Sequence, residues 1–171
     1  MSLRYLPGHA ENSLLALNLA RKEATYLESI HRTLFAMRID AVWVQQLTAQ
    51  TELAEKVEAS VSRFGRLQDH LGEKLIPLFA ALLGESTKSL LDVLAHAEKM
   101  QWLASADSFV GARKLRRRLV RKYMSDPESF LQALLEADGA AQMLFNTVSA
   151  IEAKAASVGL SEIILTKSGQ A

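Results

Sequence analysis

The chain has 171 residues, a length typical of one domain, and 49% of them are hydrophobic and 23% charged, as in ordinary globular proteins. Its formal charge is only +1, and it contains no cysteine, which excludes disulfides, thiolate metal sites and cysteine nucleophiles. Prolines number three and glycines eight, while alanine and leucine are abundant, so the composition predicts an all-α protein.

The sequence gives no indication of a membrane segment. Residues 1–13 lack the uninterrupted apolar core of a signal peptide, and no stretch long enough to span a bilayer is free of charges. We therefore expect a soluble protein with no membrane partner, and the absence of cysteine is compatible with a cytoplasmic location.

The first half of the chain predicts two long helices with a short helix between them. Apolar residues recur every three or four positions from about residue 10 to 37 and again from about residue 52 to 83. Asp40 has the position of an N-cap for the short helix, although alternating apolar residues there also allow a strand. Pro77 predicts a kink in the second long helix, and Gly84 predicts its end.

The middle of the chain predicts two further helices. The serines between Ser86 and Ser89 are expected to cap a helix that runs to about Met100. Either Ser105 or Asp107 is expected to start the next helix, which continues to the Ser-Asp-Pro-Glu sequence at 125–128.

The last long helix has the most regular apolar pattern in the chain. Ser125 and Glu128 have the spacing of a capping box, and Pro127 suits the first helical turn. Gly159 predicts the end of the helix. Between them runs a seam typical of a bundle helix, with steps of three and four residues: Ala137, Ala141, Leu144, Val148, Ile151 and Ala155.

These elements predict an all-α, up-and-down helical bundle of four long helices with one or two short helices. We expect one domain over residues 1–171, with its core at about residues 10–157 and a tail at residues 158–171.

One predicted helix, within residues 106–126, is strongly basic. Seven of the ten residues from 113 to 122 are cationic and none is acidic: Arg113, Lys114, Arg116, Arg117, Arg118, Arg121 and Lys122. Since the whole chain has a charge of +1 and this segment +7, the remaining residues sum to −6. Apolar residues between the cations share one helical face: Phe109, Ala112, Leu115, Leu119 and Tyr123. The helix is therefore amphipathic, and its cationic edge is either a solvated face or an anion-binding surface, of which the charge density favours the second.

Other candidates for chemistry are weaker. The histidines are far apart and form no metal-ligand pair at helical spacing: His9, His31, His70 and His96. Glu28 and His31 match the Glu-x-x-His of carboxylate-bridged metal bundles, but such sites need this motif twice. We predict no metal site, and we interpret His31 as a surface or boundary residue.

Two aromatic residues and one polar helix face have structural interpretations. Trp43 and Trp102 lie beside predicted loops and are expected to anchor the core. Arg63, Arg66 and Asp69 alternate with apolar residues, so they belong either to an ordinary solvated face or to ion pairs beside the basic helix.

The sequence from Arg116 to Tyr123, RRRLVRKY, resembles the signature of the HEPN superfamily, close to the HepT-like toxins, whose version is R-N-x-L-x-H-x-Y. Further segments are similar to the family from about Tyr26 to Ala155: Arg63-Phe-Gly-Arg-Leu-Gln-Asp69, Leu75-Ile-Pro77, Leu91-Asp, Ala97-Glu-Lys and Asp126-Pro-Glu128.

The resemblance implies a homodimer in which the basic helices of two subunits line a shared cleft, with no cofactor. Family members are metal-independent endoribonucleases or partners of a minimal nucleotidyltransferase. In HepT toxin–antitoxin pairs this transferase is the antitoxin and modifies the signature tyrosine, here Tyr123, with AMP. The catalytic positions correspond to Arg116, Arg121 and Tyr123. The remaining cations of the helix would bind RNA phosphates: Arg113, Lys114, Arg117, Arg118 and Lys122.

The chain departs from the signature where proton transfer takes place. Arg117 replaces the asparagine and Arg121 the histidine of the family, whether by natural divergence or by deliberate silencing. Guanidinium stays protonated near neutral pH, so it binds phosphate but cannot act as a base. We therefore expect ribonuclease activity to be absent or reduced. Two alternatives stay open, a non-catalytic substrate- or nucleotide-binding partner of a nucleotidyltransferase, and a plain helical interaction protein.

Overall fold

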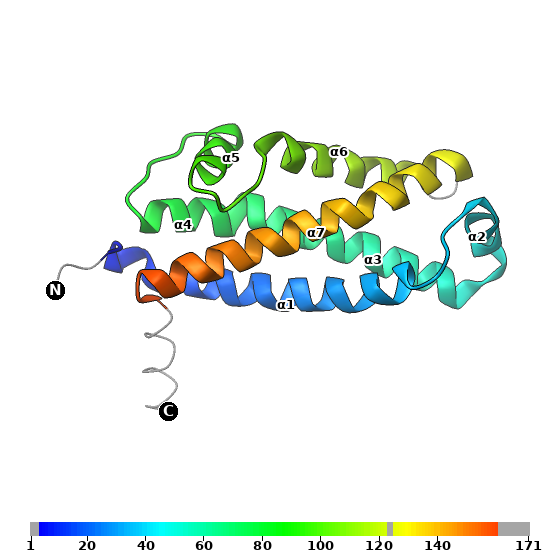
Figure 1. Ribbon diagram of the computed structural model, residues 1–171, viewed down its shortest axis with the longest axis horizontal. Coiled ribbons are helices and arrows are strands. Elements are labelled where there is room, and N and C mark those ends of the chain that lie inside the picture. The colour runs from blue at the N-terminus through cyan, green and yellow to red at the C-terminus, as the bar shows by residue number, and fades with distance from the viewer. Residues whose placement is uncertain (1–3, 123–124, 161–171) are drawn as a thin grey trace, which may run out of the picture.

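Four long rods of helix lie side by side along the length of the molecule (Figure 1). The computed structural model describes residues 4–122 and 125–160, and this part of the chain contains helices and no strand, which confirms the all-α prediction. Consecutive rods run in opposite directions, as the chain colouring in Figure 1 shows. None of the helices in the described ranges is long and apolar enough to cross a membrane.

The first rod and the short helix that follows it agree with the sequence prediction. A 3-10 turn, η1 (Pro7–His9), leads into α1 (Ala10–Phe35). The short helix α2 (Ala41–Gln46) begins after Asp40, whose carboxylate accepts a hydrogen bond of 2.9 Å from the Trp43 N–H. This N-cap satisfies one of the free donors at the start of α2, and the alternative of a strand is wrong. A second 3-10 turn, η2 (Leu47–Ala49), follows.

The second rod is continuous but changes its helical form before Pro77. It consists of α3 (Thr51–His70), the π-helical segment η3 (Leu71–Leu75) and α4 (Ile76–Leu82). Proline lacks the N–H group that an α-helix needs, and its ring clashes with the carbonyl one turn earlier. The predicted interruption is therefore realised as a wider turn that ends at Leu75, two residues before the proline.

Helix α4 ends at a left-handed glycine, and α5 begins after a serine N-cap. Gly84 has φ +87°, and the Glu85 N–H donates to the Ala80 carbonyl at 2.9 Å, which caps α4 as predicted. The next helix, α5 (Leu90–Lys99), begins after Ser89, whose hydroxyl accepts from the Asp92 N–H at 3.2 Å.

The basic helix α6 (Ala106–Lys122) begins after Ser105, whose hydroxyl accepts from the Ser108 N–H at 3.1 Å. Of the two predicted starts, Ser105 is the one found. The predicted apolar face of α6 is buried at all positions that the structure describes: Phe109, Ala112, Leu115 and Leu119. Tyr123, the last residue of that face, lies outside the described residues.

The fourth rod, α7 (Pro127–Ser157), begins one residue later than a capping box at Ser125 requires. The N-cap is Asp126, whose carboxylate accepts from the Ser129 N–H at 3.2 Å, so the prediction of a Ser125–Glu128 capping box is wrong. Since a residue before proline favours extended backbone, the residue directly before Pro127 takes the capping position. The Ser125 hydroxyl instead donates to the Arg121 carbonyl at 3.0 Å.

The core runs the length of the bundle and includes every position of the predicted α7 seam. Trp43 and Trp102 are buried in it, as predicted. Leu160 is also buried, so the first residues of the predicted tail belong to the core, while residues 161–171 lie outside the described part.

Candidate phosphate-binding site

Helix α6 lies antiparallel to the second rod and contacts it at two glycines, Gly65 in α3 and Gly72 in η3. A Cβ atom on Gly65 would overlap the Nε of Arg116, and a Cβ on Gly72 would lie 3.2 Å from a ring carbon of Phe109. The two contacts are in register, because seven residues separate the glycines and seven separate their partners. The missing side chains therefore fix both the distance between the helices and their relative position.

Arg116 crosses Gly65 to reach the next turn of α3. Its Nη1 donates to Oδ2 of Asp69 at 2.6 Å, and both side chains are partly exposed. This contact confirms the ion-pair interpretation for Asp69. The two other polar residues of that segment face α1 instead, since Arg63 Nη1 donates to the Tyr26 carbonyl at 2.9 Å and Arg66 lies 3.6 Å from Glu23.

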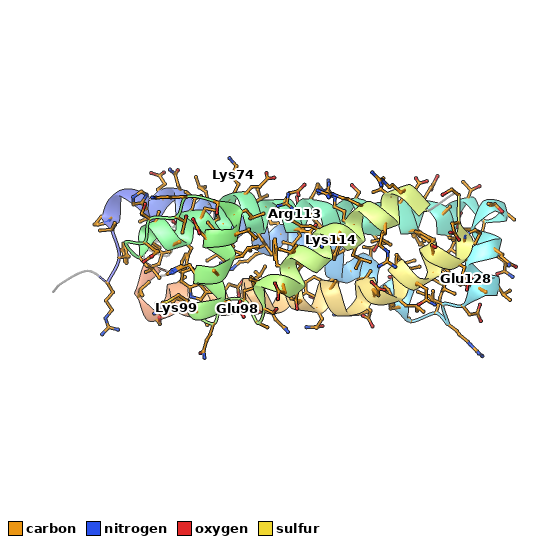
Figure 2. All side chains as sticks on the ribbon, turned by 90° about the horizontal axis from the view of Figure 1, so that it is seen from above. Lys74, Glu98, Lys99, Arg113, Lys114 and Glu128 are labelled. Carbon is orange, nitrogen blue, oxygen red and sulfur yellow. The ribbon has the colours of Figure 1, made fainter. Side chains whose placement is uncertain are left out.

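A cavity of about 320 Å³ lies between the two helices beside this ion pair. Helix α3 contributes Gln68 and Asp69, and α6 contributes five residues: Arg113, Arg116, Arg117, Val120 and Arg121. The three arginines at spacing four lie on one face of α6, separated by about 6 Å of helical rise per step. In Figure 2, Arg113 is labelled on α6 near the middle of the bundle. We call this cavity the arginine pocket.

The charge of the arginine pocket is not neutralised within the described residues. Arg113, Arg117 and Arg121 have no side-chain ion pair or hydrogen bond with any described residue. Asp69 is the one acidic residue that lines the described pocket, and it already binds Arg116. Three guanidinium groups with free donors and a shared cavity form a site for an anion, and their planar forks match phosphate oxygens.

Gln68 adds a polar group that the sequence analysis missed. Its side chain is 1% exposed, and neither its Oε1 nor its Nε2 has a hydrogen-bond partner in the described part of the chain. Leaving such a group unsatisfied costs about 1–3 kcal/mol. The sequence did indicate a buried polar group here, because Gln68 occupies a core position in the apolar stripe of α3, four residues after Phe64.

The other residues predicted to bind phosphate lie either outside the arginine pocket or outside the described part of the structure. Lys114 is exposed and does not line the pocket (Figure 2). Arg118 points to α7, where its Nη1 donates to Oε2 of Glu136 at 2.7 Å. Neither the Lys122 side chain nor Tyr123 belongs to the described part of the structure. Of the predicted catalytic and phosphate-binding residues, the structure thus brings together Arg113, Arg116, Arg117 and Arg121.

A second cavity, of about 340 Å³, adjoins the arginine pocket and shares Arg116 and Val120 with it. Its other lining residues come from α3 and α6, and half of them are apolar: Val57, Glu58, Val61, Ser62, Arg66 and Leu119. Val120 is 65% exposed although it lies between cations on α6. We call this surface the valine groove.

The histidines have partners or positions away from the arginine pocket. His31 Nε2 lies 2.7 Å from Oδ1 of Asp138, and Glu28 pairs with Arg32 at 2.9 Å rather than with His31. No group of three or more metal-ligating side chains occurs among the residues that the structure describes. The residues that line the pocket also include no imidazole. The arrangement can therefore hold phosphate, while the usual neutral-pH proton carrier is missing from the described lining.

No protein-family model, curated protein or solved structure matches this chain. By its geometry, the described part of the chain is a helical bundle with a cationic pocket, suited to phosphate, between α3 and α6.

Proposed function

We propose that this protein is a HEPN-like helical protein of the HepT type that binds RNA in the arginine pocket and acts together with a minimal nucleotidyltransferase. The observation that carries the proposal is a group of three arginines without an ion pair to any described residue, Arg113, Arg117 and Arg121, on the helix that resembles the HEPN signature. Binding of RNA phosphates to these side chains would release counterions.

The proposed function is binding with little or no cleavage. Metal-independent cleavage needs a group that accepts and returns a proton near pH 7, and the described pocket offers arginine where the signature has histidine. Arg116 is held by Asp69 and would orient a phosphate rather than transfer a proton.

An RNA cleavage assay tests this part of the proposal. The unaltered chain is expected to show no cleavage above background, and the double variant Arg117→Asn/Arg121→His is expected to gain metal-independent cleavage. Arg118→His is the control, since Arg118 binds Glu136 outside the pocket. Equal cleavage by the unaltered chain and the double variant would contradict the proposed role of position 121.

The proposed partnership is tested through Tyr123. Incubation of this protein with its proposed partner, the minimal nucleotidyltransferase, and ATP is expected to raise the intact mass of the protein by one AMP. Tyr123→Phe should abolish this increase, whereas Tyr26→Phe should not, although Tyr26 is 56% exposed. An active transferase that leaves the protein unmodified would rule out the toxin–antitoxin relationship.

A nucleotide-binding partner of the transferase is the second candidate, and Gln68 favours it. A buried carboxamide with free donor and acceptor groups is suited to a nucleobase edge, while the arginines bind the phosphates. A mononucleotide that competes fully with RNA at equal phosphate concentration would support this candidate.

A further inference from the structure

The turn after α5 keeps a side chain where backbone geometry favours glycine. Gln101 has φ +63° and is the one non-glycine residue in the described ranges with positive φ. Its N–H donates to the Glu98 carbonyl at 3.0 Å, and the Trp102 N–H donates to the Ala97 carbonyl at 2.9 Å. Glycine normally occupies this position because it adopts a left-handed conformation without steric cost. A glutamine in this backbone conformation therefore makes its side chain a candidate for a function.

That side chain lines a third cavity, of about 400 Å³, which lies away from the arginine pocket. The cavity is open to solvent on one side and is lined by the connection between α5 and α6, which follows Glu98 and Lys99 in Figure 2, and by one face of α7. Its lining consists of Gln101, Trp102, Ala104, Gly139, Gln142, Met143, Asn146, Thr147 and Ala150. No described lining residue is charged, so the cavity suits an uncharged ligand. We call it the amide pocket.

The polar groups of the amide pocket are mainly carboxamides. Gln142 Nε2 donates to Oδ1 of Asn146 at 3.0 Å, which leaves the oxygen of Gln142 and the amino group of Asn146 available. Gln101 adds a third carboxamide, and all three of these residues are exposed. Carboxamides present a donor and an acceptor side by side, the pattern that pairs with the edge of adenine.

The inner part of the amide pocket combines an aromatic ring with a thioether. Trp102 is 3% exposed, and its indole Nε1 has no hydrogen-bond partner among the described residues. Met143 lines the same cavity and is partly buried. Trp102 also packs edge to face against Phe79 and His96, and with Met143 it lines a surface that can hold a flat ring by dispersion.

We propose that the amide pocket binds an uncharged purine base or nucleoside through the carboxamides of Gln101, Gln142 and Asn146. This site is separate from the arginine pocket in both position and charge, so it binds a ligand that lacks phosphate. It does not depend on the proposed function.

Adenosine is the probe for the experiment, and the readout is the indole N–H resonance of Trp102 in ¹⁵N-tryptophan-labelled protein. The chain has two tryptophans, and Trp43→Phe assigns the remaining signal to Trp102. Saturable movement of the Trp102 signal is expected, with the Trp43 signal unchanged. No movement of the Trp102 signal up to millimolar adenosine would overturn the proposal.

Three variants and a control locate the binding. Gln142→Ala and Asn146→Ala should each weaken adenosine binding roughly tenfold, as loss of a base-edge contact does. Gln101→Gly should weaken binding while it raises the melting temperature, because it relieves the left-handed glutamine. Gln132→Ala, an exposed glutamine of α7 outside the pocket, should bind normally. Equal affinity in all four variants, or loss of adenosine binding in Arg113→Gln/Arg117→Gln/Arg121→Gln, would overturn the assignment.

Discussion

Arg116 connects the two helices that form the arginine pocket. Its side chain lies against Gly65 and ends on Asp69, so one residue sets both the spacing of the helices and one wall of the cavity. The ion pair is partly exposed and contributes no more than about 1 kcal/mol by itself. Its main effect is therefore positional.

The space around two helical glycines predicts different effects of the same substitution. Gly65→Ala should leave the free energy of unfolding within about 0.5 kcal/mol of its original value, because the gain in helix propensity is offset by loss of the ion pair with Asp69 when the flexible end of Arg116 moves aside. Gly111→Ala on α6 has open space around its Cβ and should raise stability by about 0.5–1 kcal/mol. Urea unfolding measures both, and stabilisation by both would show that Arg116 moves away without cost.

The difference between free and paired arginines predicts which charges bind RNA. Replacement of Arg113, Arg117 and Arg121 by Gln should weaken RNA binding and reduce the slope of log K against log salt by about 2, since each phosphate contact to a single strand contributes about 0.7. Fluorescence anisotropy at several salt concentrations measures this.

A matched pair sharpens that test. Arg117→Gln removes a free charge of the pocket, whereas Arg118→Gln removes the neighbouring charge that binds Glu136. The first should weaken RNA binding clearly more than the second. Unchanged affinity in the triple variant would leave the solvated basic face as the correct interpretation.

At the scale of elements, most helices followed from local rules, and the failures have local causes. The α7 seam and the caps at Asp40 and Ser89 depend on residues close in sequence, so their patterns were sufficient. The π-helical form of η3 was not predicted, because a proline in a helix can be accommodated by a kink or by a wider turn, and packing decides between them.

The corrected start of α7 makes a prediction about two adjacent residues. Asp126→Ala should lower stability by about 1 kcal/mol, because the Ser129 N–H loses its acceptor. Ser125→Ala should have a much smaller effect, since its exposed hydroxyl only donates to the Arg121 carbonyl. Thermal unfolding of both variants measures the difference, and a larger loss for Ser125→Ala would restore the capping-box assignment.

Only the α6 side of the arginine pocket could be predicted from the sequence. The spacing of Arg113, Arg117 and Arg121 along α6 places them on one face, and this follows from helical period alone. The opposite wall, Gln68 and Asp69, depends on the register between α3 and α6. That register is set by contacts between residues about fifty positions apart, which no local pattern encodes.

At the scale of the whole molecule, we expect an isologous dimer that uses the valine groove. Exposed Val120 beside the apolar residues of α3 provides a surface that a second copy would cover. Sedimentation equilibrium at micromolar concentration should give twice the chain mass of 18.9 kDa. Val120→Glu should favour the monomer, and Val42→Glu, at an equally exposed valine of α2, should not. A mass near 18.9 kDa for the unaltered protein would contradict this expectation.

The contact between Gly65 and Arg116 also restricts how the sequence can change over evolution. Any residue larger than glycine at position 65 displaces the guanidinium of Arg116, so it costs the ion pair with Asp69 for as long as arginine is kept at position 116. Related sequences should therefore vary at these two positions together, with glycine retained wherever arginine is retained. The double variant Gly65→Ala/Arg116→Ala should be more stable than is expected from adding the changes in free energy of unfolding of the two single variants. A double-mutant cycle measures this difference.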